Sequence, residues 1–351
     1  MPKHTILVTG VGGRSVGHQI LHALSEAEDR YRILVADAAA FSFGLYLGHK
    51  PFLVPLASDP GYTERIACIV REEGVRAILP GTEPEVRALA PHKEAFLKLG
   101  CHILANPAKV VDICSDKGVL DTWLTNNGFA TPRTCPLENW RELAQAVGFP
   151  LVGKPGRDTG GSRGVMLLCN EDEVLQYAQH AVPGSLAQEY VPDENHEYTV
   201  GVLLAPEGGR VIDSIVLKRE LTGLSLGSSR SVGAEHYAIS TGYSQGFIVK
   251  NAFIKQRCEE LALAIGAAGP LNIQCRHHGG DIKVFEVHPR FSGTTSIRAS
   301  VGFNEPDVLL RMLLDGQSFQ AVPHNTGVAV IRAFQHVVVP AGDYLGDIPE
   351  S

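Results

Sequence analysis

The 351-residue chain is predicted to be an α/β protein, with an N-terminal Rossmann-like domain followed by a two-lobed α+β region. Two observations predict this division. Up to about residue 105, short apolar segments alternate with amphipathic stretches, which is typical of parallel strands joined by helices. From about residue 187, apolar segments follow one another and are joined by glycine turns, which indicates antiparallel strands. A chain of this length exceeds one small core, so two or three domains or lobes are expected.

The first region opens with an apolar segment too short for a signal peptide, which we interpret as a first strand. Buried parallel strands are expected over residues 6–9, 33–37 and 77–80, and helices over residues 18–28 and 63–73. Ligands of a doubly wound sheet bind at the carboxyl ends of its strands. Two turns lie at such ends, at residues 10–17 and 81–85.

The turn at residues 10–17 is rich in glycine but fits no nucleotide fingerprint. Ser15 stands where G-x-G-x-x-G needs its third glycine, and His18 follows where a P-loop needs lysine. We interpret it as a tight strand-to-helix turn that contacts substrate. A nicotinamide-dependent oxidoreductase stays open as an alternative, which NAD-induced thermal stabilisation would support. The hydrolase-like G-x-S-x-G at residues 223–227 has no convincing helix after it, so we interpret it as a chance match.

The second region begins after Asn106-Pro107, where the pattern changes to helices over residues 108–127. A strand, a loop, a return strand and a helix are then expected over residues 149–154, 155–163, 164–169 and 171–181. The third region is predicted to hold strands over residues 197–204, 210–218, 269–276 and 283–287, with helices over residues 247–265 and 307–314.

Lys154 ends an apolar strand and precedes a loop that contains Gly160, Gly161 and Ser162. The backbone N–H groups of such a loop can bind phosphate oxygens, and the lysine adds a point charge. A surface hairpin with a solvated lysine is the alternative. The apolar residues on both sides of the loop favour buried strands and a mobile lid over phosphate.

Polar side chains also gather on two neighbouring strands near the C-terminal end. Glu286 and His288 are two apart, so they point to the same face, and Gln274 on the preceding strand can reach that face. Arg290 follows directly. Oxygen ligands suit a hard cation, and a guanidinium can stabilise developing phosphoryl charge. A solvent-exposed polar strand face is the alternative interpretation.

Composition narrows the classes of function. The net charge of −7 argues against general binding to nucleic acids or anionic membranes. The seven cysteines are odd in number and show no C-x-x-C spacing, so we expect reduced thiols in a cytoplasmic protein. No stretch approaches the ~18–20 apolar residues of a membrane span.

In this order, the motifs resemble those of the ATP-grasp superfamily, and most of all the carbamoyl-phosphate synthase large chain and its stand-alone relatives. The resemblance runs from the leading α/β domain to about residue 335. It implies a pre-ATP-grasp Rossmann-like domain over residues 1–105. An N-terminal ATP-grasp lobe with the phosphate loop would then cover residues 106–186, and a C-terminal lobe with the metal and catalytic motif residues 187–351.

The resemblance also implies roles for individual residues. The phosphates of ATP would be bound by Lys117, Lys154, Gly160, Gly161 and Ser162. The hinge around adenine would consist of Glu189, Tyr190 and Val191, with Glu189 accepting from the exocyclic amine, and Glu197 would bind the ribose hydroxyls. Mg²⁺ would be held by Gln274, Glu286 and His288, and Arg290 would stabilise the transferring phosphoryl group.

His288 departs from the family, which usually has asparagine there. Imidazole is a softer ligand that favours transition metals, so this residue points to Mn²⁺ as an alternative to Mg²⁺ or to a weakened site. An ATP-binding regulatory or partner subunit with lapsed catalysis is therefore a second interpretation.

The function implied is an ADP-forming carboxylate–amine ligase, which activates a small-molecule carboxylate as an acyl phosphate. We expect the carboxylate near Arg290 and Arg298, with Arg230 in a Gly/Ser-rich loop over residues 221–233 as a second wall. Glu83 would hold a positive group of the substrate. The expected partners are small molecules and a second copy of the chain in a homodimer.

Overall fold

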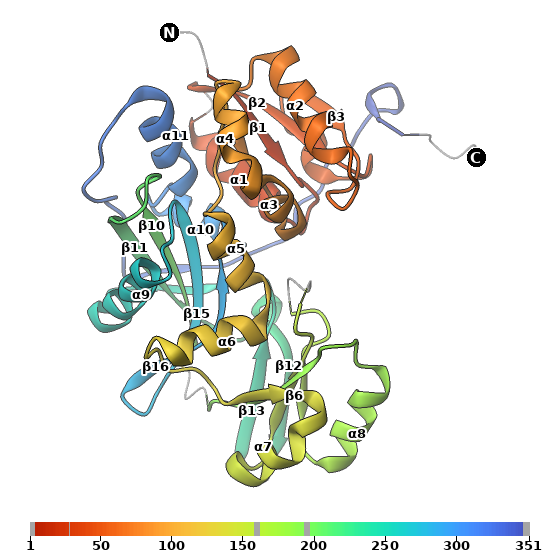
Figure 1. Ribbon diagram of the computed structural model, residues 1–351, viewed down its shortest axis with the longest axis vertical. Helices are drawn as coiled ribbons and strands as arrows, with labels where there is room; N and C mark the ends of the chain where they lie inside the picture. Colours follow the sequence, from red (N-terminus) through yellow and green to blue (C-terminus); the bar gives the residue numbers. More distant parts are fainter. Residues whose placement is uncertain (1–3, 28, 158–161, 193–196, 347–351) are drawn as a thin grey trace.

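The computed structural model describes residues 4–27, 29–157, 162–192 and 197–346, which form three main sheets and a separate two-stranded ribbon (Figure 1). The first sheet has the order β3-β2-β1-β4-β5, and all its pairs are parallel. Its strands are β1 (His4–Thr9), β2 (Tyr31–Asp37), β3 (Lys50–Leu53), β4 (Ala77–Leu79) and β5 (His102–Ile103). The predicted α/β first domain is confirmed.

Apolar side chains on both faces explain why this sheet is covered on both sides. Ile6 and Val8 pack with helix α1 (Val16–Leu24), whereas Leu7 between them packs with α2 (Tyr62–Glu73). Helices α3 (Glu83–Leu89) and α4 (Lys93–Lys98) complete the domain. The short edge strands β3 and β5 were not predicted, because two to four residues carry too little periodicity to identify a strand.

The second sheet has the order β6-β9-β7-β8 and antiparallel pairing. Its strands are β6 (Thr134–Pro136), β7 (Leu151–Lys154), β8 (Met166–Leu168) and β9 (Leu186–Glu189), and it packs against α7 (Trp140–Val147) and α8 (Glu171–His180). The predicted division between residues 186 and 187 falls within β9.

The third sheet has the order β16-β15-β10-β11-β14-β17, with antiparallel pairing throughout. Its strands are β10 (Glu197–Leu204), β11 (Val211–Arg219), β14 (Gly246–Val249), β15 (Pro270–His278), β16 (Asp281–His288) and β17 (Val328–Val330). One face packs against α5 (Ala108–Ser115), α6 (Lys117–Asn126) and α9 (Ala252–Ala264).

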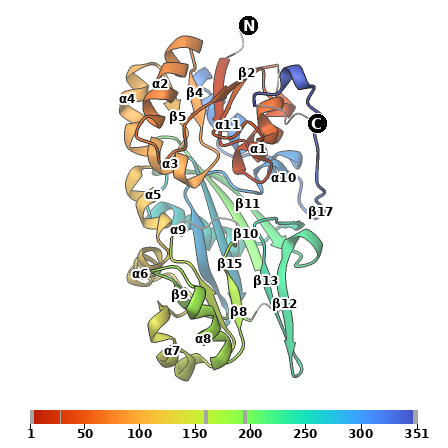
Figure 2. The ribbon, with the colours of Figure 1, turned by 90° about the vertical axis from the view of Figure 1, so that its right-hand side faces the viewer.

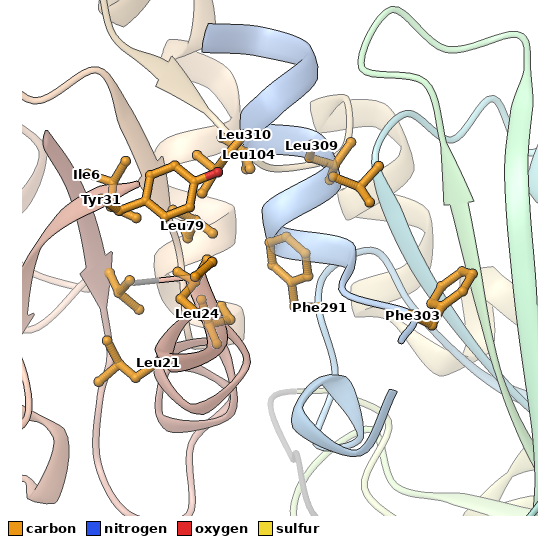
Figure 3. Close-up of a cluster of buried hydrophobic side chains, with 14 of the residues drawn as sticks. Ile6, Leu21, Leu24, Tyr31, Leu79, Leu104, Phe291, Phe303, Leu309 and Leu310 are labelled. Carbon is orange, nitrogen blue, oxygen red and sulfur yellow. The ribbon is translucent and has the colours of Figure 1, made fainter. Parts of the chain in front are cut away.

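The other face of the third sheet shares one hydrophobic core with the first domain. In this core Ile6 and Leu24 of the first domain join Phe291 and residues of α10 (Thr295–Ser300) and α11 (Glu305–Asp315) (Figure 3). Burial of such apolar surface contributes roughly 25 cal/mol per Å² to the free energy of unfolding. This shared core fixes the first domain against the lobe that carries the metal motif.

Two predicted segments differ from the structure. Residues 247–265 were expected to form one helix, but the segment begins as strand β14, and α9 starts after Asn251, whose side chain accepts from the Ile254 N–H at 3.0 Å. The loop expected over residues 221–233 instead contains β12 (Leu226–Val232), which pairs with β13 (Glu235–Ser240). Its sequence is polar and exposed, so no hydrophobic alternation marks it as a strand.

Two further observations bear on the composition arguments. All seven cysteines are free thiols. Within the described parts of the chain, every helix is too short or too polar to cross a bilayer. Ser225 of the G-x-S-x-G segment is buried and precedes strand β12, not a helix, so the chance-match interpretation is confirmed.

Candidate nucleotide and metal site

A pocket lies between the second and third sheets, and most of the predicted ATP-binding residues line it. Figure 2 shows the β12–β13 ribbon running beside the second sheet, and Ala238, Ile239 and Ser240 of this ribbon also line the pocket. The predicted site residues in its wall are Lys117, Lys154, Ser162, Glu189, Tyr190, Val191, Glu197, Gln274 and Glu286. Gly160 and Gly161 lie outside the described residues.

Lys154 ends strand β7 with a buried side chain. Its ammonium group donates to Gln188 Oε1 on β9 at 2.9 Å, and no carboxylate within the described ranges forms an ion pair with it. Burial and, to a smaller extent, Lys117 lower the pKa of Lys154 to about 8, against the opposing effect of Glu286. A buried cation without a counter-charge is costly unless an anion binds to it.

Lys117 begins helix α6, and the neighbouring Asp116 fixes this helix end. One oxygen of Asp116 accepts from the N–H groups of Gly118 at 2.8 Å and Val119 at 3.0 Å, and the other pairs with Arg157. The Lys117 N–H donates to the Gly156 carbonyl at 3.0 Å. The start of the phosphate-loop segment is thus tied to the helix that carries the first basic residue.

The β15–β16 pair brings the predicted metal ligands together. Its register places Gln274 opposite Glu286. His288 Nε2 lies 3.3 Å from Gln274 Nε2 and 3.2 Å from Glu286 Oε2, and Lys117 Nζ lies 3.9 Å from Glu286 Oε1. Burial acts to raise the pKa of Glu286, but His288 and Lys117 lower it to about 2. Glu286 is therefore an anion at neutral pH.

Glu83 of the first domain reaches the same site. Its Oε1 lies 3.0 Å from His288 Nδ1 and accepts from Arg290 Nη2 at 2.7 Å. Burial acts to raise the pKa of Glu83, but Arg290 and His288 hold it well below its usual range. Burial acts to lower the pKa of His288, but Glu286 and Glu83 raise it. The positive groups that Glu83 contacts are thus the protein's own side chains, whereas the sequence predicted a group of the substrate.

Arg298 does not occupy the predicted position beside the substrate carboxylate. Its side chain is 1% exposed, and Nη1 contacts both oxygens of Glu305 at 3.1 and 3.3 Å. Its Nη2 donates to Asn272 Oδ1 at 2.6 Å. The predicted role as a carboxylate clamp is wrong, because the guanidinium is buried and forms an ion pair with Glu305 of the protein itself.

Arg230 also differs from its predicted place. It extends from β12 to Glu173 of α8, with an Nη1–Oε1 distance of 2.5 Å, and its side chain is half exposed. It therefore joins the ribbon to the second sheet's helix and forms no wall of a carboxylate site.

The predicted adenine hinge and the predicted ribose-binding acid both line the pocket. The carboxylates of Glu189 and Glu197, however, already have partners within the protein. The carboxylate of Glu189 contacts Lys283 Nζ at 3.0 and 3.2 Å and accepts from the Arg133 N–H at 2.9 Å. Glu197 is 1% exposed and is paired with Arg219 at 3.0 Å and Arg276 at 2.8 Å. A contact from either acid to adenine or ribose stays a prediction.

Arg276 was missed by the sequence analysis, although a signal was present. It lies two residues beyond Gln274 on β15, so same-face spacing places both side chains on the pocket side of the strand. Arg219 carried no such signal, because its pairing with Glu197 depends on the β10–β11 contact.

Comparison with known proteins agrees with this architecture. Residues 6–104 match the family model described as the PylC-like N-terminal domain, and residues 182–336 match the one described as ATP-grasp in the biosynthetic pathway with Ter operon. The carbamoyl phosphate synthase large chain of Agathobacter rectalis is 23% identical over 97% of this chain and 32% of its own length. That of Haemophilus ducreyi is 27% identical over 62% of this chain and 20% of its own length. The chain thus spans a third or less of these relatives.

Similar folds occur among solved structures. An ADP complex of N5-carboxyaminoimidazole ribonucleotide synthetase has a TM-score of 0.65 at 16% identity, covering 92% of this chain and 80% of that one. Biotin carboxylase from Campylobacter jejuni gives 0.62 at 14%, covering 91% and 72%. L-amino acid ligase from Bacillus licheniformis gives 0.63 at 17%, covering 90% and 75%. Residues 182–336 thus match an ATP-grasp family model, the chain is similar in sequence to the carbamoyl phosphate synthase large chain, and its fold is shared with these solved structures.

Proposed function

We propose that the protein is an ATP-dependent, ADP-forming ligase that activates a small-molecule carboxylate as an acyl phosphate for attack by an amine or a similar nucleophile. One observation carries the proposal. Two lysines, Lys117 and Lys154, share a pocket with Glu286 and Gln274, and Lys154 has no acidic partner in the described parts of the chain. Such a pocket fits a polyphosphate together with a divalent cation.

The donor set fits Mg²⁺. Magnesium is usually held by one or two carboxylates together with substrate phosphates. Glu286 and Gln274 supply oxygen atoms, and no group of three or more His, Cys, Asp or Glu side chains forms a metal site within the described ranges. When bound, the ion would neutralise phosphate charge. The nitrogen of His288 next to Glu286 supports Mn²⁺ as an alternative.

The protein's own groups would act by positioning and neutralising charge. The substrate carboxylate oxygen would form a bond to the γ-phosphorus as the bond to the ADP oxygen breaks. Lys117 and Lys154 would hold the phosphates, and Arg290, kept in place by Glu83, would stabilise the transferring group. The nucleophile would then displace phosphate from the acyl phosphate. Because that intermediate hydrolyses readily, closure of the glycine-rich segment would need to exclude water.

The test is analysis of the nucleotide products with Mg-ATP and Mn-ATP, using pooled carboxylates and amines. We expect ADP and phosphate formation that depends on the carboxylate and is absent in Lys154→Ala. AMP as the product would contradict the acyl-phosphate route. Light scattering coupled to size exclusion would test the homodimer that we also propose.

A second candidate is an ATP-binding regulatory or partner subunit with lapsed catalysis. The observation that favours it is the position of His288 between Glu83 and Glu286, which raise its pKa; a proton on His288 would oppose a cation at the site. His288→Asn should raise turnover if catalysis has lapsed through this residue. In a ligase adapted to histidine, the same change should lower turnover.

A further inference from the structure

Arg332 lies two residues beyond strand β17, at a junction of the first domain and the third sheet. Its Nη2 donates to Gln19 Oε1 at 2.5 Å, to the Gly293 carbonyl at 2.5 Å and to Ser296 Oγ at 3.4 Å. Gln19 belongs to α1, and Ser296 belongs to α10. Two segments far from Arg332 in the sequence, helix α1 and residues 293–296, therefore hold one nitrogen of this guanidinium.

The charge of Arg332 is not compensated. All three acceptors are neutral, and no acidic side chain of the described ranges pairs with it. The fully buried arginines of this region each have an acid: Arg219 has Glu197, Arg290 has Glu83 and Arg298 has Glu305. Arg332 is half-buried, and a guanidinium partly removed from water without a counter-charge costs free energy, which an anionic ligand would recover.

The electrostatic surroundings agree with this geometry. Burial and, to a smaller extent, Arg219 lower the pKa of Arg332 to about 10, against the effect of Tyr243. Arg332 in turn contributes to the lowered pKa of His18, for which burial and His22 are larger causes. Neighbouring positive charges and burial thus disfavour the charged forms of both Arg332 and His18.

The donors of Arg332 are only partly used. Its Nη1 and Nε make no hydrogen bond to any described residue, and neither is a fully buried atom. A second cation lies nearby: Arg14, in the glycine-rich turn, donates from Nε to the Tyr243 hydroxyl at 3.0 Å and also lacks an acidic partner in the described part of the chain. Free, oriented guanidinium donors are suited to carboxylate and phosphate oxygens.

The junction includes the segment of chain that follows the proposed catalytic arginine, Arg290. Gly293 is three residues beyond Arg290, in the segment that leads into α10. On the proposed ligase function, we propose that Arg332 binds an anionic group of the small-molecule substrate, a carboxylate or a phosphate, and so selects acidic substrates.

The experiment measures anion binding to the whole protein. Succinate and inorganic phosphate are titrated at constant ionic strength against wild type, Arg332→Gln and Arg332→Lys, with chloride as the reference anion. Isothermal titration or thermal shift gives the affinity. Arg141→Gln is the matched control, because Arg141 is an exposed arginine paired with Glu171 on the second sheet's helices. Mg-ADP binding, measured in every variant, shows that the nucleotide pocket is intact.

We expect succinate or phosphate to bind wild type more tightly than chloride does. Arg332→Gln should weaken that binding at least about 10-fold, because the charge-assisted hydrogen bonds to the anion are lost. Arg332→Lys should restore part of it, and Arg141→Gln should leave it unchanged. Stronger weakening for succinate than for phosphate would identify the group as a carboxylate, and the reverse as a phosphate.

Two results would overturn the proposal: anion binding that is the same in Arg332→Gln as in wild type, or wild-type binding no tighter than that of chloride. Failure of the ligase proposal is a separate result. It would appear as carboxylate-independent nucleotide turnover or as unchanged ADP formation in Lys154→Ala, and neither depends on Arg332. A loss of Mg-ADP binding in Arg332→Gln would also overturn the assignment, because the residue would then support the fold of the pocket.

Discussion

Glu83 Oε1 accepts a hydrogen bond from Arg290 Nη2 at 2.7 Å, so a carboxylate of the first domain holds the arginine that follows strand β16. The same oxygen lies 3.0 Å from His288 Nδ1. Glu83 is the first residue of α3, at the carboxyl end of β4. The proposed phosphoryl-transfer site is therefore assembled across two domains, and the first domain contributes directly to the position of its charged groups.

Glu83→Gln should lower kcat more than it changes the KM for ATP. The amide keeps the size of the side chain but loses the charge that orients Arg290 and raises the pKa of His288. A loss of about 10-fold or more in kcat is expected, in line with the effect of other charge-positioning groups. Steady-state kinetics with Mg-ATP would measure it, with the exposed Glu72→Gln as control. Equal kinetics in the two variants would contradict a positioning role.

ADP affinity should fall as the pH rises from 7 to 9. Burial lowers the pKa of Lys154 to about 8, so in the nucleotide-free protein this lysine is charged below that pH and loses its proton above it. Phosphate binding needs the charged form, so the affinity should fall up to about 10-fold per pH unit above the pKa. Calorimetric titration of Mg-ADP would show the trend. Lys154→Gln should bind weakly with a much smaller pH dependence; a similar slope in both proteins would assign the effect to another group.

Arg298→Met should destabilise the fold and leave no specific defect in substrate recognition. The change leaves the buried Glu305 carboxylate without its partner, and breaking a buried ion pair costs about 3–5 kcal/mol. Denaturant unfolding would measure the loss. The double variant Arg298→Met/Glu305→Leu should recover much of it, because no buried charge is left unpaired. A normal unfolding midpoint with a raised KM for the carboxylate would restore the role that the sequence predicted.

Gly201→Ala should also destabilise the protein, for a steric reason. Gly201 lies on β10, and a Cβ atom there would collide with the guanidinium of Arg298. Overpacking of a filled core typically costs about 1–3 kcal/mol. Thermal unfolding would measure the effect, with Gly74→Ala, where no atom lies within 4 Å, reporting the cost of an unfavourable backbone angle alone. A smaller loss at Gly201 than at Gly74 would mean that Arg298 moves aside without cost.

Much of the architecture and part of the site follow from local patterns in the sequence. The alternation of apolar segments and helices predicted the parallel sheet, and two-residue spacing placed Glu286 and His288 on one face. Lys154 could be recognised at the end of a buried strand before a glycine-rich loop. These features can be predicted locally, because the spacing of apolar residues within about ten consecutive positions indicates both the type of element and its buried face.

The tertiary structure decided which polar side chains face one another. Glu83 and Arg290 are more than 200 residues apart, and no local pattern links them. Arg298 and Arg332 look alike in the sequence, yet one is paired with Glu305 and the other has only neutral acceptors. A guanidinium serves as a structural ion-pair partner or as a ligand-binding group according to the charge that lies opposite it. The packing of the folded chain determines that charge.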